Sequence, residues 1–350
     1  MISVEEIVRA ASAVNASDIH LITGLPPKCR SDGKIQDLFP EPLTPTDCEH
    51  IARELAADDY DNIEQIGELD LGRTIAGRRC RINLFRQQGS VSTALRILRE
   101  QIADMDDLGL PKSVYTFPSI QRGIVLVTGE TGSGKSTTLA AIINRINHTR
   151  QEHIITLEDP IEYIYTPDQC IINQREVGKD TKSFSDGLRA ALREDPDVIL
   201  VGEMRDPITI ETALTAAETG HLVLATLHTN SAVESVDRIV GSFPAERQQQ
   251  IRNELSITLQ GVIAQQLLPA VGKGRVLACE VMIVTSAIRN LIREGKTAQM
   301  ASSLLSSGNE GSITMDNCLL GLVNARKISR ETAVEAAADR AYLKKRLMMT

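Results

Sequence analysis

The sequence has no tryptophan, and aromatic residues make up only 3% of its 350 residues. Proteins that hold single-stranded nucleic acid stack the bases on aromatic side chains, so this scarcity argues against such a partner. A basic excess is missing too, because the net charge is -8 and charges of both signs are interspersed. Nucleic-acid-binding domains are usually basic, and we therefore expect no nucleic acid partner.

Long apolar runs are also missing. The longest ones, such as 124–127 and 222–225, have the length of a strand and fall far below the roughly 20 residues that span a bilayer. No basic leader precedes an apolar run at the start, where Ser3 and Glu6 have the spacing of a helix capping box. The six cysteines are scattered, without a C-x-x-C pair or a cluster at zinc-ligand spacing. We expect a reduced, soluble, cytoplasmic protein without a secretion signal or structural metal.

The chain length suits two domains. Residues 1–100 mix helix and strand signals, and the runs 80–84 and 94–98 alternate apolar with polar residues as strands do. These patterns predict a small α+β domain. Residues 101–118 are acidic and contain glycine and proline, which predicts a linker.

From residue 119 onward, short apolar runs alternate with longer helical stretches, which is the pattern of a largely parallel α/β sheet. The strands that we expect are 124–128, 154–157, 198–201, 222–226 and 276–283. From about residue 287 the pattern is helical. The second predicted domain is therefore 119–350, an α/β domain with a C-terminal helical part at about 287–350.

Residues 129–136 read GETGSGKS and match the phosphate-loop pattern G-x-x-x-x-G-K-[ST], after an expected strand and before an expected helix. The glycines let backbone N–H groups curl around phosphates at a helix N-terminus, where the helix dipole favours negative charge. Lys135 is expected to reach the β- and γ-phosphates of ATP, and Ser136 to ligate Mg²⁺. A glycine loop without nucleotide is the alternative, which the flanking strand and helix disfavour. The expected nucleotide-binding residues are Gly129, Glu130, Thr131, Gly132, Ser133, Gly134, Lys135, Ser136 and Thr137.

Two further expected strands lead into carboxylates. Residues 197–203 are an apolar run that ends at Glu203, as a Walker B element must in order to hold a carboxylate beside Mg²⁺ and the attacking water. Glu158 follows 154–157, and α/β folds bind ligands at the carboxyl ends of their strands. Each pattern also fits a buried strand that ends in a solvated acid. Which glutamate would be the general base stays open.

One histidine and two arginines complete the set of candidates. His228 ends an expected strand on the ligand side, where it would neighbour both glutamates and hydrogen-bond the γ-phosphate or a water. His221 stands at the opposite end of the same strand, so it cannot act as a local pair with His228. Arg81 and Arg96 occupy outward positions in the alternating runs, and on the residues alone they fit exposed arginines in surface ion pairs.

These motifs together resemble the secretion-ATPase superfamily, whose members share a Walker A, an Asp box, a Walker B and a His box in that order. Here these boxes are 129–136, 156–162, 197–203 and 220–228. Two more segments, 16–21 and 287–294, are similar to markers of the PilT-like type IV pilus retraction ATPases. The resemblance runs from about residue 3 to 335.

The resemblance implies a RecA-like P-loop ATPase core preceded by a PAS-like N-terminal domain. It implies a homohexamer in which each N-terminal domain packs on the next subunit's core, so that Arg81 and Arg96 supply positive charge to the transition state there. ATP hydrolysis would power pilus retraction through an inner-membrane platform protein, with the pilin fibre as an indirect partner. The expected location is peripheral, at the cytoplasmic face of the membrane at the pilus base.

Some features depart from the family or leave alternatives. Glu130 stands where the family commonly has proline. Pilus assembly and type II secretion ATPases share the core but typically add an N-terminal domain and a tetracysteine zinc module. Neither module is seen in this sequence, which favours retraction over assembly. A low-turnover nucleotide-dependent regulatory module and a DNA-translocating ATPase are further alternatives, the second disfavoured by the acidic balance. In 287–294 the helical period places Arg289 and Arg293 on a polar face, and the resemblance suggests that this segment couples hydrolysis to retraction.

Overall fold

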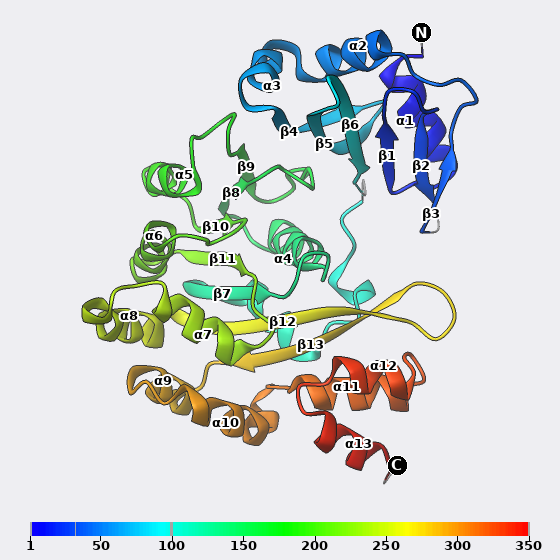
Figure 1. Ribbon diagram of the computed structural model, residues 1–350. Helices are drawn as coiled ribbons and strands as arrows, with labels where there is room; N and C mark the ends of the chain where they lie inside the picture. The colour runs from blue at the N-terminus through cyan, green and yellow to red at the C-terminus, as the bar shows by residue number, and fades with distance from the viewer. Residues whose placement is uncertain (1, 32, 99–100, 349–350) are drawn as a thin grey trace. The chain divides into compact units, whose positions relative to one another are not determined.

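The computed structural model describes residues 2–31, 33–98 and 101–348, which form two compact units (Figure 1). The first unit comprises the described residues of Met1–Ile102 together with Pro160–Ile164, and the second those of Ala103–Asp159 and Tyr165–Thr350. The predicted end of the first domain, residue 100, lies outside the described residues, as does residue 99. No helix in these described ranges is long and apolar enough to cross a bilayer.

The first unit is built on an antiparallel sheet whose described strands have the order β3-β2-β1-β6-β5-β4. Ile82 of β5 and Leu95 of β6 are buried in one core with Ile7 and Ile51 of the helices, as their alternating pattern predicts. The strands are β1 (Asp18–Leu21), β2 (Lys28–Ser31), β3 (Lys34–Asp37), β4 (Glu68–Ile75), β5 (Arg78–Gln87) and β6 (Ser90–Ile97), and the helices are α1 (Val4–Ala13), α2 (Pro45–Ala56) and α3 (Tyr60–Ile66). The expected capping box of Ser3 and Glu6 opens α1.

The second unit is built on a larger sheet with the order β13-β12-β7-β11-β10-β8-β9, in which every described pairing is parallel except β12 with β13. Its strands are β7 (Gly123–Thr128), β8 (His153–Glu158), β9 (Ile171–Glu176), β10 (Val198–Val201), β11 (Leu222–Leu227), β12 (Leu259–Pro269) and β13 (Arg275–Ile283). All five strands expected from the sequence are present. Two more, β9 and β12, were not expected.

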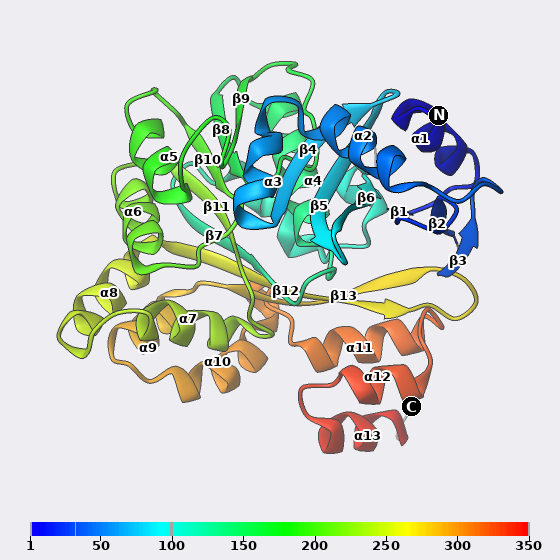
Figure 2. The ribbon, with the colours of Figure 1, turned by 45° about the horizontal axis from the view of Figure 1, so that its top comes forward.

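Most helices of this unit pack on the sheet, and the last three pack beside its β12–β13 hairpin. The core that contains Ile124 and Leu126 of β7 also contains buried residues of α5 to α10. Helices α11 to α13 form a separate core with Leu268 and Ala278 of the β12–β13 hairpin, beside which they stack (Figures 1 and 2). The helices are α4 (Lys135–Thr149), α5 (Phe184–Ala191), α6 (Pro207–Glu218), α7 (Ala232–Gly241), α8 (Ala245–Thr258), α9 (Ser286–Arg293), α10 (Met300–Ser306), α11 (Met315–Asn324), α12 (Arg330–Ala336) and α13 (Arg340–Met348).

Most of the segment expected to be a linker folds onto the second unit. It contains the short 3-10 helix η3 (Lys112–Ser119), whose Val114 and Phe117 are buried. The Phe117 ring packs against Gly261 of β12, where an added Cβ would lie only 2.5 Å from the ring atom Cζ. Composition alone misses this packing because the apolar residues are few and well separated.

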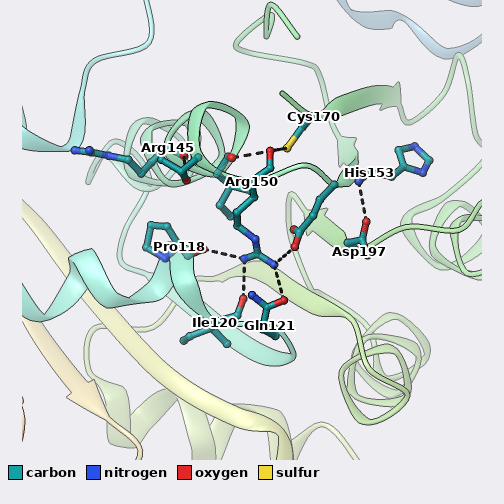
Figure 3. A network of polar contacts seen from close by, with 11 residues as sticks. Pro118, Ile120, Gln121, Arg145, Arg150, His153, Cys170 and Asp197 are labelled. Atoms are coloured by element: carbon teal, nitrogen blue, oxygen red, sulfur yellow. Dashed lines mark hydrogen bonds and ion pairs between the residues drawn. The ribbon is translucent and has the colours of Figure 1, made fainter. Parts of the chain in front are cut away.

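An arginine network fastens the end of this segment to the end of α4 (Figure 3). Arg150 donates from Nη1 to the carbonyls of Pro118 and Ile120, both at 2.8 Å, and its Nη2 is ion-paired with Glu152. Only 11% of the Arg150 side chain and 15% of the Glu152 side chain are exposed. The network fixes the backbone that leads into β7, the strand before the phosphate loop.

Replacing Arg150 with alanine is expected to lower the free energy of unfolding by about 3 kcal/mol, because it leaves the Glu152 carboxylate largely buried without its partner. Urea unfolding of the purified variant and of the wild type measures the difference. Arg122→Ala is the matched control, since Arg122 is exposed and its loss should change stability by no more than about 0.5 kcal/mol. Equal stability of the two variants would contradict the importance of the network.

Candidate nucleotide site

Parallel pairing brings the sequence motifs of the second unit to one edge of its sheet. Strands β7, β11, β10 and β8 are consecutive parallel neighbours, so their carboxyl ends meet at the same edge. The phosphate loop follows β7, and His228 follows β11. Glu203 comes two residues after β10, and Glu158 is the last residue of β8. Residues that are up to 100 positions apart in the sequence are thereby placed along one rim.

The glycines of the loop are required by its backbone. Gly129, Gly132 and Gly134 have φ angles of 140°, 82° and 95°, which residues with a Cβ rarely adopt. A Cβ on Gly129 would also lie 2.4 Å from the backbone oxygen of Gln265 in β12. Helix α4 begins at Lys135 without a side-chain cap, so the N–H groups of its first turn are left for an anion.

Lys135 folds back over its own loop. Its Nζ donates to the carbonyl of Gly129 at 2.8 Å and to that of Glu130 at 3.0 Å, and the residue is only 9% exposed. Ser136 is exposed in the first turn of α4, as is Thr131 in the loop. The lysine is thus held beside the loop by two contacts that a phosphate oxygen could replace.

Three polar atoms next to the loop are buried and have no hydrogen-bond partner within the described residues. They are the hydroxyl oxygens of Thr128 and Ser133 and the Oε1 atom of Gln265. Gln265 donates from Nε2 to Thr138 Oγ1 at 2.8 Å, so only its Oε1 atom is left without a partner. Buried polar groups are nearly always paired, so these three atoms are suited to a polar ligand or its water shell.

Glu203 is the centre of a small charge cluster on the same rim. Its Oε1 atom accepts from Arg205 Nε at 2.7 Å and lies 3.1 Å from His228 Nε2. The hydrogen bond to Glu203 raises the pKa of Arg205. His228 therefore neighbours Glu203, as the sequence predicted. Arg205 was missed, because a lone arginine in a loop carries no recognisable pattern.

Glu158 is held by two polar side chains. Its Oε1 atom accepts from Thr156 Oγ1 at 2.7 Å and from Gln174 Nε2 at 3.2 Å. Gln174 belongs to β9, a strand that was not among those expected from the sequence. At the other end of β11, His221 Nδ1 lies 2.9 Å from the carbonyl oxygen of Ala216, a contact that gives this histidine a structural role.

Arg81 and Arg96 lie in the first unit, directly opposite each other across β5 and β6. Both are exposed. Arg96 donates from Nε to Asp18 Oδ1 at 2.9 Å. The sequence did not single out Asp18 as a partner of this arginine, because 78 residues separate them.

Comparison with known proteins decides the family. The family model for type II/IV secretion system proteins matches residues 79–338. The chain belongs to this family. It is 47% identical over 336 residues to the type IV pilus retraction ATPase PilT of Pseudomonas aeruginosa, with 95% of this chain and 98% of that protein covered. It is also 49% identical over 262 residues to the twitching motility protein of Neisseria gonorrhoeae, with 75% of this chain and 70% of that protein covered.

A solved structure supports the same placement within the type II/IV secretion family. The crystal structure of the pilus retraction motor PilT with bound ADP has a TM-score of 0.92 and 48% sequence identity, covering 99% of this chain and 100% of that one. This confirms the fold expected from the sequence, an α/β ATPase core with an N-terminal sheet domain and C-terminal helices. As a PilT-type member of the family, the chain is an ATPase.

Proposed function

We propose that this chain is the motor ATPase of type IV pilus retraction and thereby powers twitching motility. The observation that carries the proposal is a phosphate loop and a Glu203–His228 pair on one sheet edge, in a chain that matches PilT over 95% of its length. The reaction is ATP + H₂O to ADP + phosphate. Its free energy would move neighbouring domains as rigid bodies.

The phosphate loop, residues 129–137, is the proposed nucleotide-binding element. The N–H groups at the start of α4 would receive phosphate oxygens where the helix dipole favours negative charge. The Lys135 ammonium would exchange its two loop carbonyls for the β- and γ-phosphates. Glu130 is exposed and would contribute only backbone.

The oxygen donors on this rim fit Mg²⁺. Ser136 offers a hydroxyl in the first turn of α4 and Glu203 a carboxylate after β10, and oxygen ligands suit this hard cation. Bound Mg²⁺ would neutralise charge on the β- and γ-phosphates. Glu158 would orient the attacking water, and His228 would hydrogen-bond the γ-phosphate or that water.

The active assembly is proposed to be a homohexamer in which Arg81 and Arg96 of one subunit act on nucleotide bound by the next. Two like charges directly opposite each other on a sheet are unfavourable. An anionic phosphate brought to them would relieve this repulsion. Positive charge near the transferred phosphoryl group stabilises the transition state, which is the work of an arginine finger.

We propose an inner-membrane pilus platform protein as the partner, with the pilin fibre acted on indirectly and no nucleic acid involved. The chain would work in the cytoplasm, peripheral to the membrane at the pilus base. Its relatives in pilus retraction and its net charge of -8 support this assignment.

Deleting the gene separates retraction from its alternatives. A retraction motor predicts cells with more pili than the wild type, none of which retract, and a plasmid copy of the chain should restore retraction. Cells without pili would instead identify an assembly ATPase. Unchanged pilus number and unchanged retraction would also contradict the proposal and leave secretion or regulation as the function.

A further inference from the structure

A row of charged side chains crosses the exposed face of the first unit's sheet. Asp18 of β1 is opposite Arg96 of β6, and Arg96 is opposite Arg81 of β5. Side chains that are opposite in an antiparallel pair lie on the same face with Cβ atoms about 4.5–5.5 Å apart. On its other side Asp18 is opposite Arg30 of β2, so this one carboxylate stands within a row that also contains three arginines.

Asp18 is held more firmly than an ordinary surface carboxylate. Arg96 Nε donates to its Oδ1 at 2.9 Å, and Ser17 Oγ donates to its Oδ2 at 2.7 Å, so both oxygens have donors. Its side chain is 18% exposed, whereas that of Arg96 is 62% exposed. Burial acts to raise the pKa of Asp18, but the hydrogen bonds from Ser17 and Arg96 outweigh it and lower the pKa. Asp18 stays ionised at physiological pH.

The contact uses only the inner edge of the Arg96 guanidinium. An arginine has five N–H donors in a planar fork, one on Nε and four on the terminal nitrogens. Within the described residues, the bond from Nε to Asp18 is the only hydrogen bond or ion pair of this side chain. The terminal edge, which can bind a phosphate through two parallel hydrogen bonds, is left exposed.

We propose that Asp18 is a positioning residue for ATP hydrolysis. It holds Arg96 by its Nε so that the terminal nitrogens face the nucleotide, and it offsets the positive charge of the Arg81–Arg96 pair. The inference rests on the proposed function of Arg96. Asp18 does not touch the nucleotide. Its effect is on the orientation of a group that must be correctly placed in the transition state, where small misplacements cost large factors in rate.

The test is steady-state phosphate release by the full-length chain as a function of ATP concentration. Asp18→Asn keeps the shape but removes the charge, and it should lower kcat roughly 10-fold to 100-fold while changing KM by less than about twofold. Asp18→Glu, which keeps a carboxylate, should recover part of the loss. The matched control is Asp70→Asn, because Asp70 lies on the same sheet and its Oδ1 accepts from Asn83 rather than from an arginine.

A double variant distinguishes positioning from a structural role. If Asp18 acts through Arg96, then Asp18→Asn should cause no further loss of kcat in an Arg96→Ala chain. Equal losses in the two backgrounds would overturn the inference, as would wild-type kcat of Asp18→Asn beside a slow Arg96→Ala. If Arg96→Ala alone turns over like the wild type, the proposed role of Arg96 fails, and the inference with it. Thermal unfolding of each variant verifies that the chain is folded, and if Asp18→Asn does not fold, Ser17→Ala should lower kcat in the same direction.

Discussion

Lys135→Ala is expected to lower steady-state phosphate release by roughly 10²-fold to 10³-fold or more, because it removes the only charged side chain of the loop that can bind phosphate. In the structure this ammonium lies within 3.0 Å of two loop carbonyls, next to the N-terminus of α4. The glycine backbone and the helix terminus remain in the variant. Nucleotide affinity should therefore weaken, while the fold is retained.

The loss is measured by phosphate release over a range of ATP concentrations, with circular dichroism to verify the fold. Lys182→Ala is the matched control, since Lys182 is exposed and lies outside the loop. Its turnover should equal that of the wild type. Near-normal turnover of Lys135→Ala would contradict the assignment of the phosphate loop.

Glu203→Gln is expected to lower kcat by roughly 10²-fold to 10⁴-fold, because it removes the carboxylate proposed to hold Mg²⁺ and, if Glu203 rather than Glu158 is the general base, that base as well. The substitution keeps the side-chain shape but removes the charge that faces Arg205 and His228. Binding of ATP uses the phosphate loop and should persist, so the variant should hold nucleotide without hydrolysing it. Phosphate release together with binding of a fluorescent ATP analogue measures both properties.

Glu158→Gln is the matched comparison and decides which glutamate matters more. Neighbouring strands lie about 4.8 Å apart, so β10, two strands from β7, is about 10 Å from the loop strand, and β8 about 14 Å. The strand that leads to Glu203 is therefore nearer to the loop strand than the one that ends in Glu158, and we expect Glu203 to be the nearer of the two to bound phosphates. A larger loss of kcat in Glu158→Gln than in Glu203→Gln would place the general base on β8 instead.

The phosphate loop and its rim could be predicted because each depends on a local pattern. Gly129, Gly132 and Gly134 belong to a motif that is visible in the sequence, and in the structure all three adopt the positive φ angles that favour glycine. Four buried parallel strands read as continuous apolar runs, and the carboxyl ends of such strands lie on one edge of a sheet. The neighbourhood of Glu203 and His228 follows from these two facts.

Contacts made by polar residues of atypical strands could not be predicted. Strand β9 lies at the edge of the sheet and has exposed positions, so its residues do not read as an apolar run. The hydrogen bond from Gln174 to Glu158 could therefore not be predicted. Strand β12 contains Gln265 at a buried position beside the loop, where an apolar residue would be expected. Gln174 is half-buried, and the burial of Gln265 depends on neighbours far away in the sequence, such as Thr138.

Arg289 shows the limit of helical periodicity. The pattern of α9 places it on a polar face, yet it donates from Nη1 to the carbonyls of Ser256 and Ile257, both at 2.8 Å. Burial lowers its pKa. Arg289 thus caps the end of α8, and its replacement would disturb packing as well as any role in coupling. Arg293 is exposed and is the better position for testing that role.

Phosphate release per subunit, measured on assemblies separated by size, tests the central claim most directly. If each site is completed by arginines of a neighbouring subunit, the hexameric fraction should hydrolyse ATP, and the monomeric fraction should be slower by roughly 10³-fold or more. Adding Arg96→Ala subunits to Lys135→Ala subunits should then restore part of the activity, since each variant supplies what the other lacks. Monomers as active as hexamers, or no hydrolysis in any fraction, would contradict an ATP-driven ring motor.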